Sequence, residues 1–210
     1  MKVEIVYIPK YSYSVNPEAG GLFPFGLVEA PSYVFSLDNF YLPECNENFV
    51  PLWMENIQAF PIFFCIECTK FWWKDYEKEC LKNNIEYKQI YSKSGRIISV
   101  ATVETLSQFK GIFPLFISMG ASNELVMWST NKDIFLIEER TWRGYWEGKK
   151  SEIPVVNFEK GNTLFWIGFD GHSIVGLSNN SFFSSFENIC KTLPSFVSAE
   201  LFEYAEEEND

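Results

Sequence analysis

A helical pattern in the middle of the chain limits the possible folds more than any other stretch. At about 100° per residue, one side of a helix over residues 69–83 is largely aromatic, and charged side chains fill most of the rest. That side carries Trp72, Trp73, Tyr76 and Cys80. Because burying one large aromatic side chain contributes about 2–3 kcal/mol, this stripe should hold the helix against a core, with Phe71 and Leu81 outside it.

Strand-like segments surround this helix. An apolar run precedes it at residues 62–64, and two alternating segments follow it at residues 85–92 and 96–103, with Gly95 in the turn of a hairpin. Further strands are expected over residues 3–8, 115–119, 125–129, 134–138, 153–158, 163–169 and 172–177. We therefore expect an α+β fold, a mostly antiparallel sheet with two to four helices packed on it.

Other helices are indicated at three places. Residues 51–59 begin with a proline and precede another, and residues 104–110 favour a helical turn. Ser181 is expected to cap a third helix, which Pro194 ends. The apolar stripe of that helix consists of Phe182, Phe183, Phe186, Ile189, Cys190 and Leu193.

The acidic charge limits the partners. With 17 basic and 28 acidic residues the net charge is −11, and much of this charge lies in the tail, residues 203–210. We expect residues 1–210 to form a single domain that ends in this tail. This balance disfavours direct nucleic-acid binding and permits a basic protein partner. Residues 1–8 do not resemble an export signal, no apolar run is long enough for a membrane, and the five cysteines are odd in number, so we expect a cytoplasmic protein. The oligomeric state is left open.

The segment 65–68 has the spacing of a thiol–disulfide exchange site. A strand, the pair Cys65 and Cys68, and a helix follow one another, and in this order the segment resembles thioredoxin-like proteins, which implies a dithiol oxidoreductase. Glu67 between the thiols opposes thiolate formation, since a nearby carboxylate disfavours a second negative charge. Structural zinc is the other interpretation of this spacing, but no second cysteine pair accompanies it. We therefore favour two structural thiols and expect no cofactor.

No other catalytic pattern is present in the sequence. His172 is the only histidine, no glycine-rich loop is followed by Lys and Ser or Thr, and no Gly-x-Ser-x-Gly motif occurs. The best interaction candidate is a cluster of residue types typical of binding hot spots: Trp142, Arg143, Tyr145 and Trp146. The same cluster would also serve to cap the open end of a sheet.

Three hypotheses for the function follow. The first is a non-enzymatic intracellular protein that binds another macromolecule, in its most specific form an immunity or antitoxin-like protein. The final hairpin and the helix beginning Ser181-Phe182-Phe183 resemble the end of SUKH-type immunity proteins, although their Leu-Pro-containing front motif is absent. The second is a small-molecule-binding protein or enzyme in which residues 10–42, an irregular segment rich in aromatic residues, form a lid over a deep pocket with an ionisable group. The third is the Cys65/Cys68 oxidoreductase.

Overall fold

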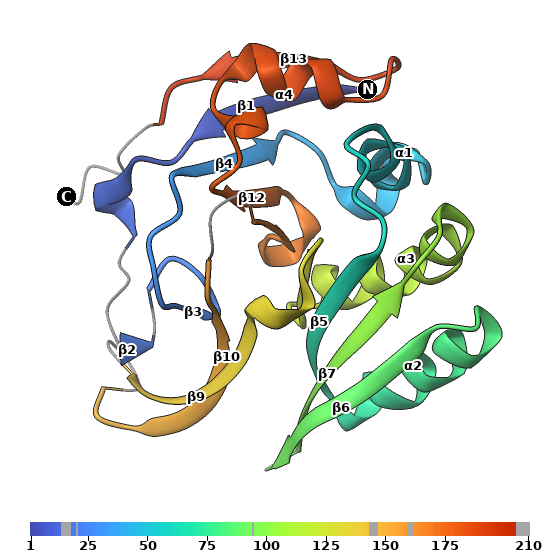
Figure 1. Cartoon of the computed structure of the whole chain (residues 1–210), viewed down its shortest axis with the longest axis vertical. Coiled ribbons are helices and arrows are strands. Elements are labelled where there is room, and N and C mark those ends of the chain that lie inside the picture. Colours follow the sequence, from blue (N-terminus) through green and yellow to red (C-terminus); the bar gives the residue numbers. More distant parts are fainter. Residues whose placement is uncertain (14–17, 20, 94, 143–146, 159–161, 205–210) are drawn as a thin grey trace.

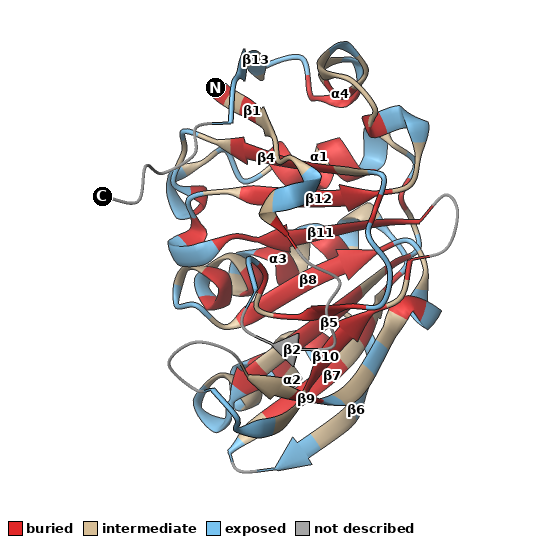
Figure 2. Cartoon of the chain, turned by 90° about the vertical axis from the view of Figure 1, so that its left-hand side faces the viewer, coloured by how far each residue is buried: buried red, intermediate tan, exposed pale blue. Residues whose placement is uncertain are grey.

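Three layers make up the molecule. A computed structural model describes residues 1–13, 18–19, 21–93, 95–142, 147–158 and 162–204. A nine-stranded sheet forms the middle layer, helices pack on one of its faces, and a four-stranded sheet covers part of the other (Figure 1). Figure 2 shows that the inner strands of the large sheet are mostly buried, whereas the edge strand at one end is largely exposed.

The large sheet has the order β13-β1-β4-β12-β11-β8-β5-β7-β6. Its strands are β1 (Lys2–Tyr7), β4 (Tyr33–Asp38), β5 (Ile62–Thr69), β6 (Glu86–Lys93), β7 (Arg96–Val103), β8 (Leu125–Ser129), β11 (Thr163–Ile167), β12 (Ile174–Ser178) and β13 (Ser198–Phe202). All neighbours are antiparallel except β1 and β13, which run parallel.

The small sheet has the order β2-β9-β10-β3. The long strands β9 (Phe135–Trp142) and β10 (Lys150–Val156) form an antiparallel pair, and the two-residue strands β2 (Glu18–Ala19) and β3 (Gly26–Leu27) add to its edges in parallel. Both sheets together confirm the expected α+β fold with mostly antiparallel strands.

The described residues contain four α-helices and several short 3-10 turns. The α-helices are α1 (Phe49–Asn56), α2 (Lys70–Lys82), α3 (Leu106–Ala121) and α4 (Phe186–Thr192). The 3-10 turns include η1 (Lys10–Ser12), η2 (Leu42–Glu44), η3 (Lys132–Ile134), η5 (Phe169–Gly171) and η6 (Ser181–Phe183). None of the helices in the described part of the chain is long and apolar enough to cross a membrane.

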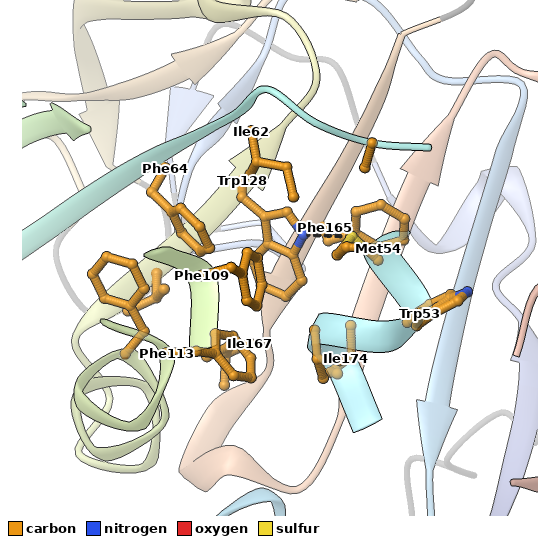
Figure 3. Close-up of a cluster of buried hydrophobic side chains, with 14 of the residues drawn as sticks. Trp53, Met54, Ile62, Phe64, Phe109, Phe113, Trp128, Phe165, Ile167 and Ile174 are labelled. Atoms are coloured by element: carbon orange, nitrogen blue, oxygen red, sulfur yellow. Dashed lines mark hydrogen bonds between the residues drawn. The ribbon is translucent and has the colours of Figure 1, made fainter. Parts of the chain in front are cut away.

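Aromatic rings dominate the core between the helices and the large sheet (Figure 3). The ring of Phe64, on β5, lies 4.4 Å from that of Phe116 on α3 and 5.5 Å from that of Trp128 on β8, measured between centroids. Trp128 stacks on Phe165 of β11, which meets Trp53 of α1 edge-on. Since each buried ring removes about 150–250 Å² from water, this cluster supplies much of the hydrophobic stabilisation.

The stripe expected on the central helix is confirmed. Tyr76 and Cys80 of α2 are fully buried, and Trp72 and Trp73 are partly buried against the same core. The hydroxyl of Tyr76 lies 3.2 Å from that of Ser99, so the ring is fixed by a hydrogen bond as well as by packing.

Helix α3 overturns one strand prediction. Residues 115–119, expected as a strand, are its second half, and residues 104–110 are not an isolated turn but its beginning. Thr105 and Gln108 form a capping box that starts the helix, and its buried side chains recur at helical spacing through Phe116. Pro114 lies inside the helix and obscured this periodicity.

Two further expectations need correction. Ser181 begins a 3-10 turn, and α4 is instead capped by Ser185, whose Oγ accepts a hydrogen bond from the backbone N–H of Asn188. Phe182 therefore projects from the turn with 64% of its surface exposed instead of joining the stripe. The segment 10–42 is also not irregular throughout, because its later part forms β4, an inner strand of the large sheet.

Candidate functional site

A cavity of about 270 Å³ lies along the edge of the large sheet where several inner strands begin or end, beside the small sheet. The ends of β5, β7, β8 and β11 contribute lining residues, as do the last turn of α3, the end of β9 and Pro24 of the segment 10–42. The residues that matter chemically are Glu67, Arg96, Glu124, Trp142, Trp166 and Phe169.

An ion pair between neighbouring strands lines one side of this cavity. Side chains two residues apart on a strand lie on the same face of the sheet. Glu67 on β5 therefore shares a face with Cys65, and Arg96 on β7 shares a face with Ile98. Both Cys65 and Ile98 belong to the core that faces the small sheet. Oε1 of Glu67 accepts a hydrogen bond from Nε of Arg96 and forms an ion pair with Nη2 of the same guanidinium. Nη1 of Arg96 also reaches the backbone oxygen of Glu152 on β10, at 3.5 Å, so this side chain links the two sheets.

A second carboxylate comes from the turn between α3 and β8. Asn123 has a positive φ of 61°, and the chain then enters β8 through Glu124. Oε1 of Glu124 accepts hydrogen bonds from the backbone N–H of Thr69 at 3.3 Å and from its hydroxyl at 2.9 Å. Since Thr69 is the residue that precedes the first turn of α2, Glu124 lies where the helix dipole favours negative charge.

Reciprocal hydrogen bonds fix the neighbouring turn. Nδ2 of Asn123 donates to Oδ1 of Asp170 at 2.7 Å, and the backbone N–H of Asp170 donates to Oδ1 of Asn123 at 2.9 Å. Asp170 and Gly171 both have positive φ, at 55° and 71°, which gives the chain a tight turn here. The rim of the cavity is therefore built from turns that hold each other in place.

Burial and charge act against each other at Glu67. Its side chain is 16% exposed, and this burial raises the pKa of the carboxyl, whereas the Arg96 guanidinium lowers that pKa and the nearby Glu124 raises it. The net direction is upward. The site thus holds two carboxylates close enough to repel each other beside one guanidinium.

Aromatic side chains form further walls of the cavity. Trp166 on β11 is 5% exposed and meets Phe23 and Phe25, of the segment 10–42, and Phe169 edge-on. Phe169 itself is 58% exposed at the rim. Trp142 is held by a 2.5 Å hydrogen bond from its Nε1 to Oγ of Ser151.

The structure places one of the four residues of the predicted hot-spot cluster at this cavity. Trp142 lines it, whereas Arg143, Tyr145 and Trp146 lie outside the described residues. Glu67, Arg96 and Glu124 were not predicted as a site. Their only sequence signal is a charged residue next to apolar strand residues, and nothing in the sequence indicates that the three meet.

The two cysteines of the redox hypothesis are not brought together. Cys65 and Cys68 both lie within β5, which extends beyond the expected strand at residues 62–64 as far as Thr69. Their side chains enter the cores on opposite faces of the large sheet. Three residues of extended strand separate their Cα atoms by about 10 Å, beyond the about 7 Å limit for a disulfide. Burial raises the pKa of both thiols, that of Cys68 to about 12, and Glu67 raises both further.

The described part of the chain holds no group of three or more His, Cys, Asp and Glu side chains suited to a metal ion. His172 lies outside the cavity, with its ring 5.1 Å from that of Tyr41. No protein-family model, curated protein or solved structure matches the chain.

Proposed function

We propose that the protein binds a small organic molecule in the cavity beside the small sheet. The observation that carries this proposal is a preformed hollow with indole walls and a partly buried ion pair, a combination of apolar walls and a few polar groups that is usual in small-molecule sites. Its volume of about 270 Å³ is close to the lower end of the range of about 300–1,000 Å³ for such sites, so the ligand is small.

Part of the segment 10–42, which was expected to form a lid, lies at this site. Pro24 lines the cavity, and Phe23 and Phe25 on either side of it pack on Trp166. The arrangement supports the second of the three sequence hypotheses more than the others, because it joins an aromatic segment to a pocket with ionisable groups.

Ligand-observed NMR with a fragment library tests the proposal. We expect a subset of fragments to bind and to lose binding when Trp142→Ala removes one wall. The matched control is Phe71→Ala, because Phe71 is 75% exposed on α2 and lies outside the cavity. Fragments that bind equally well to both variants and to the wild type would place the binding elsewhere and refute the proposal.

The outer face of α2 favours a second candidate, binding of another macromolecule. Phe71 and Leu81 are 75% and 73% exposed, and exposed lysines lie between them at four-residue spacing. A partner for this face is acidic, which differs from the basic partner suggested by net charge. The double variant Phe71→Ser/Leu81→Ser should release any protein that co-purifies with the chain from its native host, and retention of that protein would rule this face out.

A further inference from the structure

We propose that the ligand of this cavity carries a positive charge, as an ammonium or a substituted ammonium group. The proposal rests on the proposed small-molecule function and adds the chemical class of the ligand. Two independent features support it: the charges and open acceptor atoms of the site, and the aromatic walls next to them.

The charge of the described lining residues is the first feature. Glu67 and Glu124 contribute two carboxylates, and Arg96 contributes one guanidinium, so the ionised lining has an excess of one negative charge. Glu124 is one of the groups that raise the pKa of Glu67, because the two carboxylates repel each other. A cation bound between them would relieve this repulsion, whereas an anion would increase it.

The hydrogen bonds of these groups also favour a cationic ligand. On both glutamates Oε1 accepts the hydrogen bonds from described residues, and no described residue donates to Oε2 of either. One N–H of the Asn123 amide donates to Asp170, and the indole N–H of Trp142 donates to Ser151. The Oε2 atoms of the two glutamates are therefore open acceptors, and an ammonium group, which has only donors, complements them.

The aromatic walls are the second feature. Trp142, Trp166 and Phe169 line the same cavity as the carboxylates. The faces of such rings carry negative partial charge and attract cations, tryptophan most strongly. A cavity that combines indole rings with carboxylates is suited to a cation with an apolar body.

Other ligand classes fit less well. An anion that displaced Glu67 from Arg96 would leave a largely buried carboxylate without its partner. A neutral ligand could contact the rings but would bring no positive charge to the second oxygens of the two glutamates. The contact of Glu124 with Thr69 and the link from Arg96 to β10 explain how these side chains are held, but they use neither of those oxygens.

Calorimetric titration of the full chain with three size-matched compounds tests the inference. The probes are phenethylamine, 2-phenylethanol and phenylacetate, accompanied by a quaternary ammonium compound and its neutral isostere. We expect the cations to bind about tenfold or more tightly than the alcohol, and the acid to bind most weakly. Glu124→Gln and Glu67→Gln should each remove most of this preference, while Glu104→Gln, which removes one exposed charge outside the cavity, should not.

The outcomes separate the two proposals. If neutral or anionic fragments bind at Trp142 and the cations show no advantage, the charge inference is overturned while the binding function stands. If no compound of the panel or the fragment library binds, both proposals fail. If one glutamine variant does not fold, the other still measures whether the preference depends on the carboxylates.

Discussion

Replacing Arg96 by methionine should destabilise the protein by an amount that depends on pH. The Glu67 and Arg96 side chains are 16% and 34% exposed, so the pair lies between two limits. A surface pair is worth about 0–1 kcal/mol, and removing one partner of a buried pair costs about 3–5 kcal/mol. Since methionine keeps much of the apolar stem, we expect the free energy of unfolding to fall by about 2 kcal/mol near neutral pH.

The direction in which the stability loss of Arg96→Met changes with pH follows from the Glu67 carboxyl, which remains in the variant. Burial already raises the pKa of Glu67 in the folded protein, and loss of Arg96 would raise it further. A carboxyl that holds its proton more tightly in the folded than in the unfolded chain costs stability as the pH rises from its unfolded to its folded pKa. The variant extends this range upward, so its deficit should be largest near neutral pH and shrink as the pH falls toward the ordinary glutamate value of about 4.3.

Urea unfolding followed by tryptophan fluorescence, near neutral pH and near the glutamate pKa, measures this deficit. Lys93→Met is the matched control, because Lys93 and Glu152 are 69% and 40% exposed at 3.6 Å and their pair should contribute less than about 1 kcal/mol. The double variant Glu67→Gln/Arg96→Met removes the titrating group and should show no pH-dependent deficit. An equal loss at both pH values in the single variant would refute the electrostatic account.

Two further predictions concern the cores. Cys65 and Cys68 should resist iodoacetamide in the native protein and react only on unfolding, because both are at most 1% exposed and burial raises the pKa of each thiol. Mass spectrometry measures the labelling, and rapid labelling of the native protein would contradict the prediction. Gly176→Ala would bring a Cβ within 2.2 Å of the buried Phe35 ring and should cost about 1–3 kcal/mol in urea unfolding, whereas Gly21→Ala, with no atom within 4 Å, should be nearly neutral.

The parts of the fold that the sequence predicted are those with local causes. The stripe on α2 and the hairpin of β6 and β7 follow from periodicity and from a turn glycine, and both are present. Helix α3 shows the limit of this reasoning, because Pro114 divided one continuous apolar pattern into two apparent elements. The capping residues Thr105 and Gln108 would have identified its start.

The small sheet and the site depend on contacts between distant segments. The strands β2 and β3 are two residues long and pair with β9 and β10, more than 100 residues further along the chain, so no local pattern announces them. The same holds for the site: Arg96 meets Glu67 only because β7 pairs with β5, and Glu124 joins them only because β8 pairs with β5 on its other side. Periodicity can place each charge on a strand, but only the register can bring the charges together.

The widths of the two sheets explain why charged residues gather at this cavity. A nine-stranded sheet with helices on one face needs apolar cover on the other, and a four-stranded sheet covers only part of that face. On the face of β5 toward the small sheet, Cys65 lies in the core and Glu67 lies nearer the end of the strand. A carboxylate at that boundary is tolerated because Arg96 and solvent from the cavity share its charge. The incomplete cover thus yields a cavity that is partly shielded from solvent, where electrostatic contacts are stronger than on an open surface.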